Sequence, residues 1–280
     1  MAITVEQVGT TVHTLVAKAR VSPPAPTSSR GSSTKTYKCA KCRDVGWLAV
    51  LDDGRVFPFG ALETVGETPP ARKCDCQDEA QRHQLMTTSQ ISPKFRRKSF
   101  NNFYVKGRPK AVQIAYQVAR KYAEDFLFRR HEDKNSLALL GVSGSGKTHL
   151  LMAVANQLMA EGVSVLYWPW VEGKGDLKGE RNLIEAKLRQ MRGVDVLFID
   201  DLLKGTAEPT PFEFDSVFGI INFRVQNGLP MLISSELDLD TIRKFDNALG
   251  RRIAEVCTVA QIALYSGETG VLDYTLASRR

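Results

Sequence analysis

Three glycines, a lysine and a threonine lie close together between residues 141 and 148, in an order suited to binding phosphate. The pattern is G-x-x-x-x-G-K-[ST]; an apolar run precedes it and a helical pattern follows it. Glycines let successive backbone N–H groups converge on phosphate oxygens, and the start of a helix adds positive potential. The sequence therefore predicts a nucleoside triphosphate site, with a glycine-rich turn and a chance lysine as the alternative. The expected nucleotide contacts are Gly141, Ser143, Gly144, Ser145, Gly146, Lys147, Thr148 and His149.

Two adjacent carboxylates supply the second half of this chemistry. Residues 194–201 read Val-Asp-Val-Leu-Phe-Ile-Asp-Asp, an apolar strand that ends in Asp200 and Asp201. Parallel strands are apolar throughout and deliver functional groups at their C-terminal ends. We expect Lys147 to reach the β- and γ-phosphates, Thr148 and Asp200 to hold Mg²⁺, and Asp201 to orient or deprotonate the attacking water. The alternative is an acidic pair that only begins a turn.

Four of the five cysteines form two close pairs, Cys39 with Cys42 and Cys74 with Cys76. Two such pairs can close a tetrahedral Zn²⁺ site, and a segment this short needs a metal or another staple to fold. Two disulfides or four free thiols are the alternatives. The C-x-C spacing is unusual, and His83 is a reserve ligand. Cys257, in an apolar context, is expected to be a buried thiol.

The elements that position these groups follow an α/β pattern. Strands are expected at 136–140, 163–167, 194–199 and 230–234, with helices after the first three and another at about 110–128. This alternation predicts a central parallel sheet. Our expected domains are an amphipathic helix and flexible linker at 1–36, a zinc-binding module at 37–90 and an ATPase domain at 91–280.

Charge is spread unevenly over the 280 residues. Residues 1–110 have a formal net charge of +9 and residues 111–280 have one of −2, which together give the +7 of the whole chain. A basic front end favours a polyanion or an acidic protein partner, with solubility alone as the alternative. The basic and aromatic stretch 91–110 either binds single strands or packs beside a bound base, and the second is favoured because the ATPase domain follows directly. No apolar run is long enough for a membrane span, so we expect a cytoplasmic protein.

With these pieces placed, the chain resembles the bacterial and phage replicative-helicase loaders of the DnaC/DnaI kind, within the AAA+ ATPases. The resemblance covers nearly everything from Cys39 onward. It is carried by the motifs Cys39 to Gly46, Cys74 to Cys76, Gly141 to Leu150, Phe198 to Leu202, Ile220 to Arg224, Leu232 to Glu236 and Leu249 to Ile253. The zinc cysteines joined to this ATPase core are more specific than the phosphate loop alone.

The resemblance implies further roles. Ser235 matches the polar sensor that contacts the γ-phosphate or its water, and Arg252 matches the arginine finger that completes a neighbour's site, with Arg251 as a competitor. Self-association into a hexamer-like ring or spiral follows. A helical insertion at about 170–191 is implied to touch single-stranded DNA, through Lys174, Lys178 and Arg181.

Two departures from the family argue for slow ATP hydrolysis. Thr275 stands where members often have a second sensor arginine, and Asp201 stands where many AAA+ enzymes have glutamate. The implied function is ATP-dependent loading of a hexameric replicative helicase onto single-stranded DNA during the initiation of DNA replication. The alternatives are a transposition-helper ATPase of the IstB kind and a nucleotide-gated adaptor without significant turnover.

Overall fold

The computed structural model describes residues 37–51, 53–60, 70–177, 180–205 and 211–262. The predicted N-terminal helix and linker at 1–36 lie outside the described residues. So do Lys178 and the C-terminal departure at Thr275. In the ranges that the structure describes, no helix is both long and apolar enough to cross a membrane.

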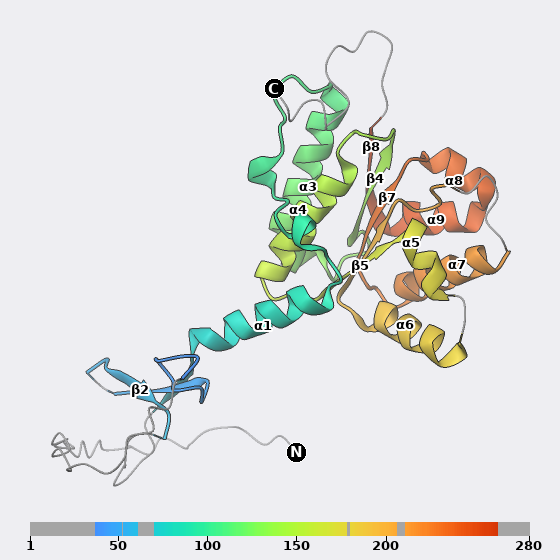
Figure 1. Ribbon diagram of the computed structural model, residues 1–280. Coiled ribbons are helices and arrows are strands. Elements are labelled where there is room, and N and C mark those ends of the chain that lie inside the picture. Colours follow the sequence, from blue (N-terminus) through green and yellow to red (C-terminus); the bar gives the residue numbers. More distant parts are fainter. Residues whose placement is uncertain (1–36, 52, 61–69, 178–179, 206–210, 263–280) are drawn as a thin grey trace, which may run out of the picture.

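A five-stranded parallel sheet forms the centre of the larger domain (Figure 1). Its strands are β4 (Ser136–Gly141), β5 (Val165–Pro169), β6 (Val196–Asp200), β7 (Met231–Ser235) and β8 (Cys257–Ile262), in the spatial order β5-β6-β7-β4-β8. The four predicted strands are present, shifted by one or two residues. β8 was not predicted; it pairs in parallel with β4 at the sheet edge and buries Cys257.

Helices cover both faces of this sheet, because alternate residues of each buried strand point to opposite sides. Leu137 and Leu139 of β4 pack in one core with α3 (Lys110–Arg129) and α4 (Lys147–Ala160). Ala138 and Leu140 pack in the second core, on the other face. The helices of that face are α5 (Trp170–Gly173), α6 (Arg181–Gly193), α7 (Pro211–Gln226), α8 (Leu239–Phe245) and α9 (Asn247–Val256), with a 3₁₀ turn η2 (Lys174–Leu177) after α5. The predicted α/β architecture with a parallel sheet is confirmed.

A small antiparallel sheet lies apart from this domain. It consists of β1 (Trp47–Val50), β2 (Val56–Pro58) and β3 (Ala71–Lys73), in the order β2-β1-β3. The predicted hairpin corresponds to β1 and β2, and β3 is an addition. The buried apolar cluster beside this sheet consists of three residues, Cys42, Leu48 and Cys74. The core of this small unit is therefore very small.

Helix α1 (Asp75–Thr88) joins the small sheet to the larger domain as an extended arm (Figure 1). None of its residues is buried, as expected for a helix that spans between two units. Its root is anchored where the carbonyl of the buried Ser89 accepts a hydrogen bond of 2.8 Å from the backbone N–H of Tyr167, in β5. The lead-in then follows as α2 (Pro93–Arg96) and a 3₁₀ turn η1 (Phe100–Asn102).

One buried cation holds the end of the sheet at which the strands β6 and β7 begin. The guanidinium of Arg224, in α7, donates from Nη1 to the carbonyls of Met191 (2.7 Å) and Val194 (3.0 Å), and from Nη2 to those of Asp195 (2.8 Å) and Pro230 (2.9 Å). These carbonyls come from α6 and from the segments that lead into β6 and β7. Arg224 therefore ties the α6–β6 and α7–β7 connections together at the N-terminal ends of these strands.

Replacing Arg224 tests this role. Arg224→Met keeps the length of the side chain but leaves these carbonyls without their donors, so we expect the free energy of unfolding to fall by about 3 kcal/mol. Urea denaturation measures the change. The matched control is Arg120→Met, which removes an exposed i,i+4 pair with Glu124 and should alter stability by less than about 0.5 kcal/mol. Equal losses in the two variants would contradict the clamp.

Candidate functional site

The phosphate-binding loop occupies the turn between β4 and α4. β4 ends at Gly141 and α4 begins at Lys147. Gly144 and Gly146 have φ of 73° and 97°, values that side chains rarely tolerate. Gly141, with φ of 128°, also lies so close to β8 that a Cβ would overlap the carbonyl of Ile262. The loop thus has the tight, glycine-dependent geometry that the sequence pattern predicts.

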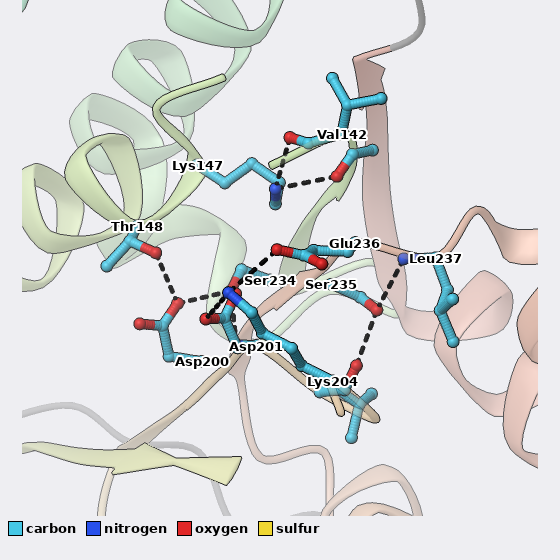
Figure 2. A network of polar contacts seen from close by, with 12 residues as sticks. Val142, Lys147, Thr148, Asp200, Asp201, Lys204, Ser234, Ser235, Glu236 and Leu237 are labelled. Atoms are coloured by element: carbon cyan, nitrogen blue, oxygen red, sulfur yellow. Dashed lines mark hydrogen bonds and ion pairs between the residues drawn. The ribbon is translucent and has the colours of Figure 1, made fainter. Parts of the chain in front are cut away.

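Lys147 lies back across its own loop (Figure 2). Its Nζ donates to the carbonyl oxygens of Gly141 (2.8 Å) and Val142 (2.9 Å), and the residue is only 5% exposed. Burial lowers the pKa of this ammonium, since desolvation disfavours the charged form. Its ammonium therefore lies within the loop that is predicted to hold phosphate.

Asp200 is buried at the end of β6 and accepts hydrogen bonds from three hydroxyls. Thr148 donates to Oδ1 (2.9 Å), Tyr167 donates to Oδ2 (3.0 Å), and Ser234 donates to Oδ1. Burial raises the pKa of this carboxyl, while the bonds from Ser234, Thr148 and Tyr167 oppose that rise. The structure thus brings together the two predicted Mg²⁺ ligands, Thr148 and Asp200. A carboxylate beside a hydroxyl is an oxygen donor set that suits this hard cation.

Asp201 and two residues that the sequence reading missed form a charged group beside the loop. Lys204 Nζ lies 3.0 Å from Asp201 Oδ2 and 2.9 Å from Glu236 Oε1 (Figure 2). Glu236 directly follows β7 and Lys204 lies in the turn after β6, at the C-terminal ends of the strands, where functional groups of parallel sheets gather. Their position shortly after two predicted strands was the sequence signal by which both residues could have been selected as candidate site residues.

Ser235 is turned toward the neighbouring loop. Its hydroxyl donates to the carbonyl of Leu202 (2.7 Å) and accepts from the N–H of Leu237 (3.1 Å). Glu236, the next residue, lines the cavity together with the phosphate loop, whereas Ser235 does not line it. The sensor role of Ser235 stays a prediction.

The lead-in segment forms one wall of a cavity of about 260 Å³ over the loop. Phe95 packs edge-on to Tyr167 at a ring-centroid distance of 5.9 Å, so one of the aromatic residues packs beside the expected nucleotide. His149 Nε2 lies 2.9 Å from Asn102 Oδ1, and burial lowers the pKa of this imidazole to about 4. The lining residues are Lys94, Phe95, Lys98, Ser143, Gly144, Gly146, Lys147, Thr148, His149, Asp201, Lys204 and Glu236.

The predicted arginine finger does not line this cavity, and neither do Lys174 and Arg181, the two predicted DNA contacts that the structure describes. Arg252, in α9, donates from Nη1 to Glu255 at 2.9 Å, and neither it nor Arg251 lines the pocket of its own chain. Lys174 lies in η2, and the largely exposed Arg181 begins α6 and pairs with Glu185 at 2.9 Å. The structure leaves the roles of these residues as predictions.

The four paired cysteines meet at the root of the small sheet. Their Sγ atoms all lie within 4.8 Å of one another, with 3.9 Å between Cys39 and Cys74 and 3.4 Å between Cys42 and Cys76. All four are free of disulfides. Sulfurs bound at about 2.3 Å around a tetrahedral zinc lie about 3.8 Å apart, so this donor set fits Zn²⁺. The C-x-C spacing is accommodated because Cys74 caps α1 and Cys76 lies in its first turn.

Known proteins resemble the chain in sequence and in fold. The profile of the Bacterial DnaA ATPase domain family matches residues 95–260. The phage-like element PBSX protein XkdC of Bacillus subtilis (strain 168) is 39% identical over 231 residues, covering 81% of this chain and 82% of XkdC. The replicative helicase loader DnaC of Buchnera aphidicola subsp. Schizaphis graminum (strain Sg) is 29% identical, covering 56% of this chain and 61% of that protein.

A solved structure agrees with this placement at the level of the fold. The crystal structure of DnaI superposes with a TM-score of 0.53 at 23% identity, covering 62% of this chain and 95% of that chain. The central parallel sheet, the phosphate loop and the family match together establish an AAA+ nucleotide-binding ATPase fold. The chain belongs to the Bacterial DnaA ATPase domain family, as an AAA+ P-loop protein related to the DnaC and DnaI helicase loaders.

Proposed function

We propose that the protein loads a hexameric replicative helicase onto single-stranded DNA, in an ATP-dependent step of the initiation of DNA replication. The observation that carries this proposal is the combination of two parts in one chain. A four-cysteine module stands on a helical arm, and that arm is rooted beside an AAA+ nucleotide site. A switch that moves a partner needs both a nucleotide site and a separate surface for the partner.

The nucleotide site supports ATP binding with Mg²⁺. The loop amides and Lys147 would hold the phosphates, while Thr148 and Asp200 would hold Mg²⁺, whose charge offsets that of the phosphates. Asp201 would orient the attacking water. Its carboxylate is paired with Lys204, so hydrolysis requires a rearrangement at this pair and should be slow.

The exposed surface supports a role in binding other macromolecules. Trp47 on β1 is 45% exposed and Phe59, whose N–H donates to the carbonyl of Trp47 at 3.0 Å, is 37% exposed. Large exposed apolar residues on so small a module favour contact with a protein partner. We assign this module to the helicase, and the basic residues Lys174, Lys178 and Arg181 to single-stranded DNA.

The relatives support the same assignment. DnaC of Buchnera is named a replicative helicase loader, and the relative at 39% identity belongs to a phage-like element. We infer that the chain loads the helicase during replication of a phage type. A nucleotide-gated adaptor without turnover is the second candidate, which the Lys204–Asp201 ion pair favours.

Loading is tested directly with the purified chain, its cognate helicase and single-stranded DNA. Lys147→Ala should weaken ATP binding by about 100-fold, since it removes a charge-assisted contact to two phosphates, and loading should be lost. Transfer of helicase to DNA is the readout. Lys121→Ala, on the exposed side of α3, is the matched control. Absence of any association with the helicase in either nucleotide state would exclude the loader, and loading without turnover would favour the adaptor.

The arginine finger is tested by comparing two neighbouring residues. Arg252→Ala should leave ATP affinity unchanged but lower the hydrolysis rate of the assembled protein by about 10³-fold, because guanidinium stabilises charge on the transferred phosphoryl group. Steady-state turnover as a function of protein concentration gives the measurement. A loss confined to Arg251→Ala would move the role to Arg251, and no loss in either would contradict completion of the site by a neighbour.

Zinc in the cysteine cluster is tested by metal analysis. We expect one Zn²⁺ per chain, released in Cys39→Ser/Cys42→Ser together with the folded structure of the small sheet, because the metal contributes folding free energy there. Cys257→Ala removes a buried thiol elsewhere and should keep the metal. Wild-type protein without zinc would refute the assignment.

A further inference from the structure

The turn after β6, residues 201–205, is held in an unusual backbone conformation. Asp201 and Leu203 have φ of 55° and 63°, in the left-handed region that non-glycine residues rarely adopt. Hydrogen bonds from β7 hold the turn: Ser234 Oγ accepts from the N–H of Asp201 (2.7 Å), and the Ser234 carbonyl accepts from that of Leu202 (2.8 Å). Leu202 and Leu203 are buried beneath it. The position of Lys204 at the end of this turn is therefore built by its surroundings.

From this turn the Lys204 ammonium bridges two carboxylates on adjacent strands. It contacts Asp201 after β6 and Glu236 after β7, as Figure 2 shows. Glu236 lines the same cavity as Ser143 of the phosphate loop, and contact with Lys204 lowers the pKa of Glu236. The contacts with Glu236 and Asp201 raise the pKa of Lys204 in turn. The bridge thus joins the segments that follow β6 and β7, beside the phosphate loop.

The same three side chains line the cavity over the phosphate loop. A γ-phosphate entering this cavity brings negative charge toward Asp201 and Glu236, and like charges at short range repel each other. Lys204 is the cation already placed between them. It is partly exposed, with 37% of its side chain accessible, so it can change partners without unfolding its turn.

We propose that Lys204 distinguishes ATP from ADP within a single chain. Its ammonium bridges Asp201 and Glu236 when no γ-phosphate is present, and contacts γ-phosphate oxygens when ATP is bound. That exchange leaves the Asp201 carboxylate free to orient water. This inference rests on the proposed ATP-binding function. It adds to that function a contact made within one subunit, because Lys204 acts in its own subunit whereas Arg252 is assigned to a neighbour's site.

Nucleotide affinities of charge variants test the exchange. Titration calorimetry with ADP, and with an ATP analogue whose β–γ bridge is a non-hydrolysable imido group, gives the preference for the triphosphate. Lys204→Met should lower that preference about tenfold, since a charge-assisted contact is lost, while Lys204→Arg should keep most of it. Glu236→Gln should raise the preference several-fold, because it removes a competing carboxylate yet keeps the length and polarity of the side chain.

The opposite signs separate this exchange from a structural ion pair. If the pair only held the two loops together, Lys204→Met and Glu236→Gln would change the preference in the same direction, and that result would overturn the inference. Lys187→Met is the matched control, because Lys187 also bridges two partners, Asp176 and Gln90, at a distance from the cavity. Its preference should equal that of the wild type.

Two further outcomes are distinguishable. Wild-type protein that binds both nucleotides, with Lys204→Met indistinguishable from it, would overturn the Lys204 inference and leave the proposed function standing. Wild-type protein that binds neither nucleotide would overturn both. Circular dichroism and thermal unfolding of each variant show that the comparison is made between folded proteins.

Discussion

A buried carboxylate, that of Asp200, is the constraint on which the rest of the site depends. Removing a carboxylate from water is costly unless its oxygens are hydrogen-bonded. Here the partners come from three different elements: Thr148 at the start of α4, Tyr167 in the middle of β5 and Ser234 in β7. Satisfying one side chain therefore sets the spacing of the phosphate loop from two strands. A change in the charge at Asp200, such as the arrival of a cation, must be felt by all three.

Tyr167 extends this constraint to the arm. Its hydroxyl binds Asp200, its backbone N–H binds the carbonyl of Ser89 at the root of α1, and its ring packs against Phe95 of the lead-in. Tyr167 thus links the nucleotide site directly to the end of α1 that lies against the larger domain. Contiguous contact of this kind is a physical route by which occupancy of the pocket can bias the arm, provided that the arm has two arrangements.

Local patterns in the sequence were sufficient for the parts of the fold that depend on short-range rules. The glycine spacing before Lys147, the apolar run before Asp200 and the pairing of the cysteines each specify a local geometry, and the structure shows them. What the sequence could not predict depends on contacts between distant segments. β8 is a strand because β4 offers it an edge. Glu236 lines the pocket and Ser235 does not, because the Ser235 hydroxyl bonds to the carbonyl of Leu202 in the turn after β6. The role of Lys204 could not be predicted for the same reason, because its ion-pair partner Glu236 lies 32 positions away in the sequence.

The two edges of the sheet serve opposite purposes. At the N-terminal edge Arg224 donates only to backbone carbonyls, in full burial, so its contacts are not exchangeable with solvent or ligand. At the C-terminal edge the cations Lys147 and Lys204 make contacts that a phosphate oxygen can replace, because carbonyls and carboxylates are acceptors of the same kind. Because the N-terminal ends of the strands are held rigidly, the side chains at the C-terminal ends can rearrange without loss of the fold. The charged groups that we propose to respond to nucleotide are therefore concentrated at the strand ends that face the phosphate loop.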